Sequence, residues 1–216
     1  MNKEAKIIFS ITGIVVICVL ILMIVSPKQA APATQTFTET QLVRDTSHMT
    51  GTTTAKVTIV EFGDYECPAC GAAEPIIEQV LATYATSSDF NFVFRNFPLP
   101  QHPNALIAAE AAEAAGAQGK FWEMHNLLYA NQDQWADSTT PTDVFMKYAT
   151  TLGLDTTKFK KALDNQTYQD AISTDQNDGN VINVEWTPSI YINGVLQQQT
   201  PTFDQFKTQI DALLQK

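Results

Sequence analysis

A short run of β-branched and aromatic residues, followed at once by two cysteines, is the feature that most constrains how this chain can fold. Residues 57–62 (VTIVEF) contain one acid among residues that favour strands, which is typical of a central strand covered on both faces. After a turn at residues 63–66 comes the sequence Cys-Pro-Ala-Cys at residues 67–70. Proline suits the first turn of a helix, because an N–H group would have no partner there. The segment therefore predicts a strand that leads into a helix, with Cys67 and Cys70 at the start of that helix.

Two thiols at this spacing can hold a metal, form a permanent disulfide or exchange disulfides with another protein. The sequence contains 3 cysteines, and Cys18 lies in an apolar segment, where we interpret it as an apolar filler. A structural zinc site takes four Cys or His ligands, whereas a second cysteine pair is missing and His102 and His125 lie far along the sequence without helical spacing. A disulfide framework would need more cysteines at wider spacing. We therefore expect no metal, and the pattern favours thiol–disulfide exchange.

An uncharged apolar segment at residues 7–25 is long enough to cross the ~30 Å hydrocarbon core of a bilayer as a helix. We predict an uncleaved transmembrane anchor, since a secretory signal peptide has a shorter apolar region of about 7–15 residues and a cleavage site close behind it. Cleavage is the alternative. Lys3 and Lys6 precede the segment, so the positive-inside tendency places residues 1–6 in the cytoplasm as a stub. The rest of this single-pass protein of the cell membrane is then extracytoplasmic.

Residues 26–50 predict a flexible linker, because they are rich in Thr, Ala, Pro and Gln and poor in large apolar residues. The pair Leu42-Val43 could begin the folded domain, which we place at residues 51–216. The formal net charge of the chain is −10, and its positive charges form no basic stripe. We therefore expect no binding to nucleic acid or to anionic lipid through a basic patch.

Patterns typical of helices and strands follow the cysteines. Apolar residues at helical spacing continue the first helix to about residue 85, and Pro75 within it predicts a kink. Residues 89–97 predict a second strand, which a right-handed crossover joins in parallel to the first. Residues 101–180 then predict a series of helices, each opening near a residue that can cap it.

Strands return near the end of the chain. Residues 189–193 predict a strand, and Asn193-Gly194 predicts a hairpin turn into a partner strand at residues 195–200. Residues 202–215 predict a closing amphipathic helix. The order is therefore β-α-β, a helical insertion and β-β-α, which indicates the α/β class.

Three segments of the chain occur in a characteristic order: VEFGDYECPAC, then FRNFPLPQHPNALIAAEAAEAAGAQGKFWEMHNLLY, then TPSIYING. Together they span most of residues 57–214. They resemble the thioredoxin fold, and more closely the DsbA-type (DsbA-like) thiol–disulfide oxidoreductases, in their membrane-anchored bacterial form. The resemblance implies a thioredoxin fold around a central mixed sheet, a helical domain inserted at about residues 101–180, and a transmembrane helix in front.

The two cysteines have different expected roles. Free N–H groups and the positive end of the helix dipole favour a thiolate at Cys67, and a thiolate is the nucleophile of disulfide exchange. Cys70, one turn further, is close enough to form the disulfide and to resolve a mixed disulfide. The resemblance implies the same roles, with Cys67 exposed and attacking and Cys70 buried and resolving.

The resemblance adds three further candidates. It implies that Pro188 follows a cis peptide bond and faces the disulfide, and that the backbone of Thr187 pairs with substrate; an ordinary trans turn is the alternative, since about 5–6% of X–Pro bonds are cis. It also implies that Glu61 is a buried acid. With a raised pKa, Glu61 could exchange protons with Cys70; the alternative is that it points to the sheet edge or to solvent.

The residues around the cysteines tune their redox potential. The resemblance implies that the strongest oxidants of the family carry Pro-His between the cysteines, whereas here Pro68 and Ala69 leave out a polar donor. Asp64 and Glu66 precede the pair, and negative charge opposes a thiolate. We therefore expect an oxidant that is weaker than the Pro-His members.

The leading hypothesis is a protein disulfide oxidoreductase that acts as a dithiol oxidase. Its redox-active Cys67–Cys70 disulfide, with no other cofactor, would accept electrons from unfolded or reduced exported proteins, and a quinone-linked membrane partner would reoxidise it. We expect a monomer. The alternatives are a reductase or isomerase of the same fold, or a non-catalytic chaperone or scaffold.

Overall fold

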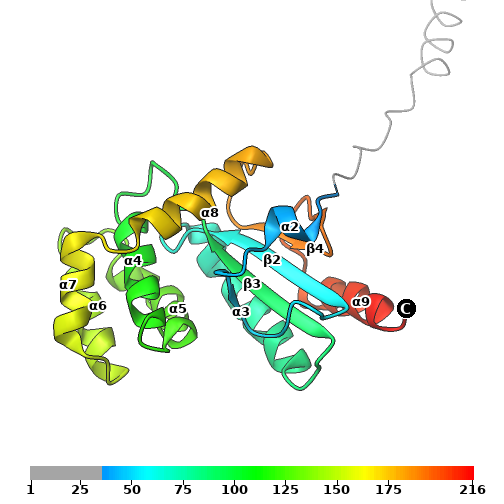
Figure 1. The fold of residues 1–216 in the computed structure, drawn as a ribbon, viewed down its shortest axis with the longest axis horizontal. Coiled ribbons are helices and arrows are strands. Elements are labelled where there is room, and N and C mark those ends of the chain that lie inside the picture. Colours follow the sequence, from blue (N-terminus) through cyan, green and yellow to red (C-terminus); the bar gives the residue numbers. More distant parts are fainter. Residues whose placement is uncertain (1–35) are drawn as a thin grey trace, which may run out of the picture. The chain divides into compact units, whose positions relative to one another are not determined.

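A mixed β-sheet forms the centre of the computed structural model, which describes residues 36–216. Across that part of the chain the strand order is β1-β3-β2-β4-β5, with β2 and β3 parallel and the other neighbours antiparallel (Figure 1). The strands are β1 (His48–Met49), β2 (Val57–Gly63), β3 (Phe90–Asn96), β4 (Ser189–Ile192) and β5 (Val195–Leu196). This arrangement confirms the predicted α/β class and mixed sheet.

Helices cover both faces of the central strands, and every residue of β2 and β3 is buried. On one face, α3 (Pro68–Tyr84) and α9 (Phe203–Leu214) pack on the sheet, where their side chains meet Ile59, Phe92 and Ile190. The other face carries a separate apolar cluster, which consists of Leu42, Val60, Phe62, Val93, Phe97, Ile182, Val184 and Tyr191. The near-continuous apolar character of both strands follows from this double coverage.

The helical insertion lies between β3 and β4, as predicted. It consists of α4 (Ala105–Gly116), α5 (Phe121–Ala130), α6 (Pro141–Thr151), α7 (Thr156–Asn165) and α8 (Gln169–Val181), with a 3₁₀ turn at Gln132–Gln134. The alanine-rich α4 packs against the other four helices, because its small side chains let their backbones approach. Figure 1 shows α4–α7 gathered beyond one end of the sheet and α8 returning across it.

The predicted boundary at residue 50 is wrong, because ordered structure begins earlier. A short helix, α2 (Glu39–Leu42), buries Leu42 to 1% exposure, and β1 extends the sheet beside β3. The apolar Leu42-Val43 pair therefore starts the folded part. The predicted stub 1–6, the predicted membrane segment 7–25 and residues 26–35 of the predicted linker lie outside the described residues. Within residues 36–216, no helix combines the length and the hydropathy needed to span a bilayer.

The hairpin between β4 and β5 uses the predicted turn. Asn193 and Gly194 have φ angles of 45° and 81°, the left-handed pair that a tight two-residue turn requires. A Cβ atom at Gly194 would come within 2.0 Å of the Phe37 carbonyl oxygen, so glycine is needed here for space as well. The second strand is shorter than predicted: the Gln197 N–H still donates to the Ile190 carbonyl, and the chain then leaves the sheet.

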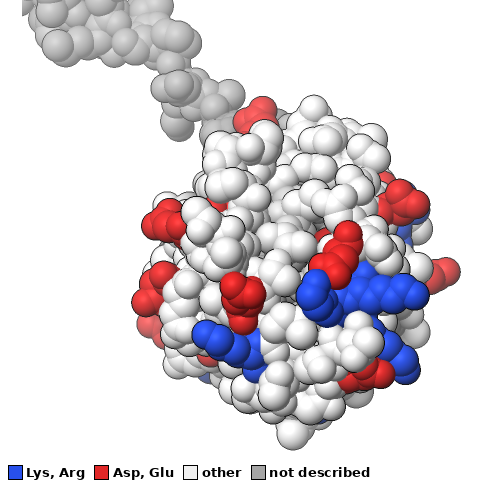
Figure 2. All heavy atoms as spheres, turned by 90° about the vertical axis from the view of Figure 1, so that its left-hand side faces the viewer, with Lys and Arg blue, Asp and Glu red and all other residues white. Residues whose placement is uncertain are grey.

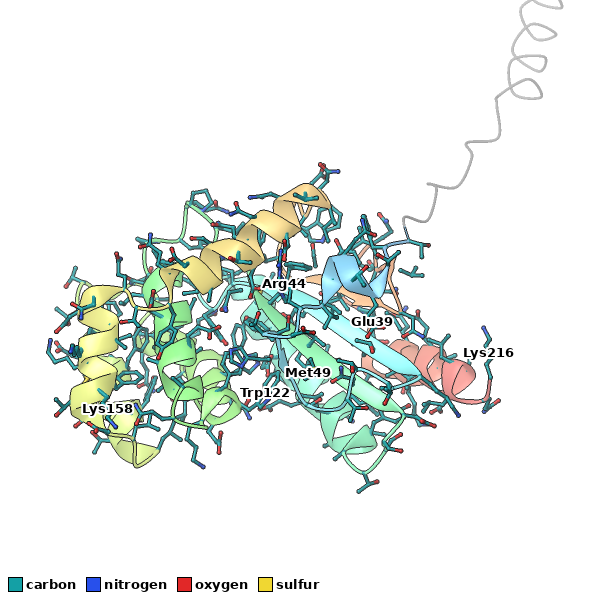
Figure 3. The ribbon with its side chains drawn as sticks, in the orientation of Figure 1. Glu39, Arg44, Met49, Trp122, Lys158 and Lys216 are labelled. Atoms are coloured by element: carbon teal, nitrogen blue, oxygen red, sulfur yellow. The ribbon has the colours of Figure 1, made fainter. Side chains whose placement is uncertain are left out.

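A fully buried arginine joins the sheet to the outer segments. The Arg95 guanidinium on β3 donates to Asp175 (2.6 Å) and Asp178 (2.5 Å) on α8 and to the Leu42 carbonyl (2.6 Å). Arg44, labelled in Figure 3, binds Asp178 from the other side. This network fixes α8 and the segment after α2 on the sheet, because each buried charge has a partner.

Replacing Arg95 with methionine should lower the free energy of unfolding by about 3–5 kcal/mol, because Asp175 is left in a buried site without its counter-charge. Urea denaturation followed by circular dichroism measures this loss. Lys160→Met is the matched control: Lys160 pairs with Asp164 (2.7 Å) on exposed α7, on the face where Figure 2 shows lysines beside acidic residues. Its unfolding midpoint should match that of the wild type. A loss below about 1 kcal/mol for Arg95→Met would contradict the assigned role.

Candidate functional site

The cysteine pair lies at the start of α3, just after the turn that connects it to β2, as the sequence predicts. Cys67 occupies the N-cap position of α3, Pro68 is the first helical residue, and the Gly71 N–H donates to the Cys67 carbonyl (3.1 Å). Both cysteines are free thiols in this structure. Cys67 is 7% exposed and Cys70 is 0% exposed. The expectation of an exposed Cys67 is therefore wrong in degree: Cys67 is the more accessible of the two thiols, but neighbouring segments cover most of it.

One of those segments is the loop before β4. The Cys67 sulfur lies 3.4 Å from the Thr187 carbonyl oxygen, which can accept the thiol proton when Cys67 is protonated. Thr187 is buried at 6% exposure, and the Thr187–Pro188 peptide bond is cis. The antiparallel pairing of β4 with β2, in which Ser189 lies opposite Phe62, brings this loop to the cysteines. The fold thus places the two sequence-predicted positions, Thr187 and Pro188, beside Cys67.

Local donors stabilise the Cys67 thiolate. The hydrogen bond from the Cys70 thiol, with further help from Thr187 and from the backbone N–H groups of Cys70 and Ala69, lowers the pKa of Cys67 to about 5, although burial opposes this change. Ala69 therefore contributes through its backbone, while its side chain and that of Pro68 face solvent. At neutral pH Cys67 is a thiolate, which is the reactive form in disulfide exchange.

Cys70 has the opposite electrostatics. Its burial, followed by the neighbouring Cys67 and the charge of Glu61, raises its pKa well above the ordinary value. Cys70 thus keeps its proton at neutral pH and shares it with the Cys67 sulfur. The two thiols, three positions apart, are held in different protonation states.

Glu61 lies in the interior beneath the cysteines. It is 0% exposed on β2, which excludes the alternative that it points to solvent, and among the described residues neither of its carboxylate oxygens has a hydrogen-bond partner. Burial, followed by the charges of Glu74 and Cys67, raises the pKa of Glu61 well above its ordinary value. A carboxyl group in these surroundings can hold a proton at neutral pH.

Asp64 and Glu66 are not free charges next to the thiolate, contrary to the interpretation from sequence. The Asp64 carboxylate accepts hydrogen bonds from the Leu99 N–H (2.8 Å) and pairs with His102 Nδ1 (2.6 Å). Glu66 accepts from the Asn104 N–H (2.5 Å). His102 was considered from sequence only as a zinc ligand, although it lies in the second of the three segments that carry the resemblance.

His102 is a titratable group near the cysteines, and its protonated form is positive. Burial lowers its pKa, but the hydrogen bond and charge of Asp64, followed by the charges of Cys67 and Glu66, raise it overall. His102 thus favours the thiolate in the absence of a histidine between the two cysteines. Across residues 36–216, His, Cys, Asp and Glu side chains form no group of three or more arranged to hold a metal ion.

An open hollow of about 770 Å³ adjoins the cysteine motif. Its wall consists of Glu66, Pro68, residues 101–104, residues 132 and 133 and residues 136–139. Gln132 also fixes the motif, because its side-chain amide donates to the backbone carbonyls of Tyr65 (2.7 Å) and Cys67 (2.9 Å). Gln132 was not predicted as a site residue, because nothing in the sequence around it indicates contact with the cysteines.

The pKa of Cys67 provides a test of this electrostatic arrangement. The rate of iodoacetamide alkylation should rise with pH around a midpoint of about 5 in the reduced protein. His102→Gln should raise that midpoint by about half a pH unit, because it removes positive charge near the thiolate. His48→Gln is the control, since His48 pairs with Glu113 (2.9 Å) at the sheet edge. An unchanged midpoint in His102→Gln would contradict this role for His102.

The described geometry agrees with comparisons to known proteins. The pattern of the thioredoxin family matches residues 43–212. "Probable disulfide bond formation protein D" of Bacillus cereus is 29% identical over 215 residues, which cover 97% of this chain and 95% of that protein. "Na(+)/H(+) antiporter NhaA 3" of Salinispora tropica is 41% identical over 151 residues, 69% of this chain. The chain spans 22% of that antiporter, so the shared segment is a minor part of it.

Solved structures agree on the fold. Oxidised BdbD from Bacillus subtilis superposes with a TM-score of 0.72 at 23% identity, covering 85% of this chain and 98% of that one. Alpha-DsbA1 from Wolbachia pipientis gives a TM-score of 0.70 at 18% identity, covering 80% and 92%. The thioredoxin fold that the resemblance implies is thereby confirmed. Because the family pattern covers most of the chain from β1 to α9, the chain belongs to the thioredoxin family.

Proposed function

We propose that this chain is an extracytoplasmic thiol–disulfide oxidoreductase that introduces disulfides into exported proteins through Cys67 and Cys70. The observation that carries the proposal is the asymmetry of the pair: a stabilised thiolate at the start of α3 lies beside a buried, protonated thiol. A structural disulfide does not require two sulfurs of different pKa, whereas thiol–disulfide exchange requires one sulfur that attacks or leaves easily. A relative named for disulfide bond formation supports the same reaction.

The reaction begins with the oxidised Cys67–Cys70 disulfide. A substrate thiolate attacks Sγ of Cys67, the disulfide breaks, and its electron pair goes to Sγ of Cys70, which takes up a proton. A second thiolate of the substrate then attacks the substrate sulfur of the mixed disulfide and releases Cys67 as a thiolate. The substrate dithiol loses two electrons and becomes a disulfide, and the enzyme disulfide gains them. The low pKa of Cys67 makes it a good leaving group in the second step.

Two neighbours of the cysteines complete the proposed mechanism. Glu61 is the group that gives a proton to Cys70 when the disulfide opens and takes it back on reoxidation, since its raised pKa allows it to hold that proton. Thr187, next to Pro188, presents its backbone beside Cys67 and pairs with the extended substrate chain. The adjoining Trp186 is one of two large apolar side chains that stand exposed in residues 36–216, and an unfolded substrate offers apolar segments to it.

The setting of the reaction follows from the sequence. We propose that residues 7–25 anchor the protein in the cell membrane with its N-terminus in the cytoplasm. The substrates are unfolded or reduced exported proteins, and a quinone-linked membrane partner accepts the electrons. The acidic chain acts as a monomer without nucleic acid.

Oxidative refolding of a reduced, disulfide-containing protein tests the reaction. The oxidised wild type should restore activity to the substrate, and Cys67→Ser should abolish this. With an oxidised substrate, the Cys67 thiolate of Cys70→Ser should attack a substrate disulfide and hold a mixed disulfide that appears on non-reducing gels. A reductase would mainly precipitate insulin in the presence of a thiol donor, and a scaffold would do neither. If the substrate refolds no faster with the wild type than with Cys67→Ser, the proposed oxidase activity is refuted.

The redox potential tests how strong the oxidant is. A lower pKa of the attacking thiol stabilises the reduced form, and thioredoxin, with a pKa of about 7, has about −270 mV, whereas DsbA, with about 3.5, has about −120 mV. With a Cys67 pKa of about 5, the potential should lie between these values. Equilibration with glutathione buffers measures it. A potential as low as that of thioredoxin would contradict the assignment of an oxidant.

A further inference from the structure

The side chain of Gln132 reaches the start of α3 from the helical insertion. Its Nε2 atom donates to the backbone carbonyls of Tyr65 (2.7 Å) and Cys67 (2.9 Å), so one amide group joins two residues of the turn between β2 and α3. The Cys67 carbonyl also accepts the Gly71 N–H (3.1 Å), which is the first backbone hydrogen bond of the helix. Gln132 therefore acts at the residue where α3 begins.

Gly71 provides the space that the Gln132 side chain occupies. A Cβ atom at Gly71 would lie 2.7 Å from Gln132 Oε1, 3.2 Å from Cδ and 3.3 Å from Nε2. The carboxamide thus lies against the backbone of α3, where a side chain at this position would otherwise be. Gly71 lies inside the helix and its φ angle is not positive, so its conformation does not require glycine. Since alanine is favoured over glycine inside a helix, contact with Gln132 is the physical reason for glycine here.

The insertion fixes the backbone of Gln132. Its carbonyl accepts the N–H groups of Trp135 (3.2 Å) and Ala136 (2.9 Å). Trp135 is 0% exposed, and its Nε1–H donates to the Leu128 carbonyl (2.9 Å). The Asn104 side-chain amide donates to the carbonyls of Trp135 (3.2 Å) and Ala136 (2.8 Å). Ordering a glutamine side chain costs conformational entropy, and a backbone that is already fixed reduces what remains to be ordered.

The turn that Gln132 holds determines where the Cys67 sulfur points. Cys67 has φ −67° and ψ 121° at the N-cap position, which places its side chain at the N-terminal end of the helix. There the sulfur lies beside the N–H groups of Ala69 and Cys70 and 3.4 Å from the Thr187 carbonyl oxygen. Hydrogen bonds weaken steeply when their distance or angle changes. A small rotation of this turn would therefore remove donors from the thiolate.

We propose that Gln132 is a positioning residue: its carboxamide, which lies on Gly71 and binds the Cys67 carbonyl, holds the turn so that the Cys67 sulfur stays beside the N–H groups at the start of α3. Gln132 acts through the backbone of Cys67 and exchanges no electrons. The inference rests on the proposed function for the use of the Cys67 thiolate in disulfide exchange. It makes Gln132 and Gly71 a matched pair, one on the insertion and one on the thioredoxin core.

The pH dependence of Cys67 alkylation tests this role. Iodoacetamide modifies the reduced full-length protein, and mass spectrometry follows the label on Cys67. Gln132→Met keeps the length of the side chain and removes its donors, so the midpoint should rise by about half a pH unit toward the ordinary cysteine value. Gly71→Ala should raise it similarly, because the new Cβ displaces the carboxamide. Gln134→Met is the matched control and should leave it unchanged, since Gln134 is exposed on the same turn and donates to the Asn131 side chain (2.9 Å).

A double-mutant cycle shows whether Gly71 and Gln132 act together. Gln132→Ala should raise the Cys67 midpoint as Gln132→Met does, and adding Gly71→Ala should raise it no further, because no carboxamide is left to displace. Thermal unfolding gives an independent readout. Gly71→Ala should raise the unfolding midpoint in the Gln132→Ala background, where alanine favours the helix and nothing opposes its Cβ. Shifts in the Cys67 midpoint that simply add would contradict the pairing.

Each outcome decides the inference. A folded Gln132→Met with an unchanged Cys67 midpoint overturns it, as does an equal shift in Gln134→Met. If the Gln132 variants fail to fold, Gly71→Ala decides: a raised midpoint supports the inference and an unchanged one overturns it. This variant keeps the fold, because its Cβ meets only the far end of a flexible side chain. Alkylation uses no substrate, so failure of the proposed function would abolish oxidative refolding by the wild type and leave these midpoints in place.

Discussion

The stabilisation of one thiolate at the start of α3 is the interaction on which the site depends. A negative sulfur needs donors, and the first turn of a helix offers backbone N–H groups that have no other partner. Those donors lie in the right place because β2 ends at Gly63 and a short turn delivers Cys67 to the N-cap position. The sheet adds the second condition, since pairing of β4 with β2 brings Thr187 against the same sulfur.

The helical insertion does more than cover the sheet. Its segments supply groups that act on the cysteine motif from outside the thioredoxin core: Gln132 binds the carbonyl of Cys67, and His102 pairs with Asp64. His125 of α5 reaches the interior behind Cys70. A motif of four residues thus has neighbours from a separate set of helices. Ala69, which lacks a polar side chain, is compatible with a low Cys67 pKa, because the Cys70 thiol, Thr187 and backbone N–H groups lower it.

Local sequence patterns predicted the helices and strands of this fold, but they did not predict contacts between residues that are distant in sequence. The run at residues 57–62, the Asn193-Gly194 turn and the apolar face of α9 each indicate one element, because periodicity and turn chemistry act over a few residues. The short strand β1 was not predicted, because two residues show no periodicity and their pairing with β3 is a long-range contact. For the site, Cys67 and Cys70 followed from spacing, and Glu61, Thr187 and Pro188 from the resemblance. The roles of His102 and Glu74 could be identified only from the structure, because the effect of a charged group depends on the residues that bind it.

The buried acids of this interior contribute to the proposed function, whereas the Arg95 network contributes to stability. A buried carboxyl group without a hydrogen-bond partner lowers stability, so Glu61 adds little to the fold. Arg95 shows the contrast, because each of its three guanidinium nitrogens donates a hydrogen bond and the network joins three segments. Glu61 has no such partners in residues 36–216 and lies directly beneath the cysteines. In the proposed mechanism this unpaired carboxyl exchanges a proton with Cys70, whereas a carboxylate bound by several donors would hold its charge too firmly to do so.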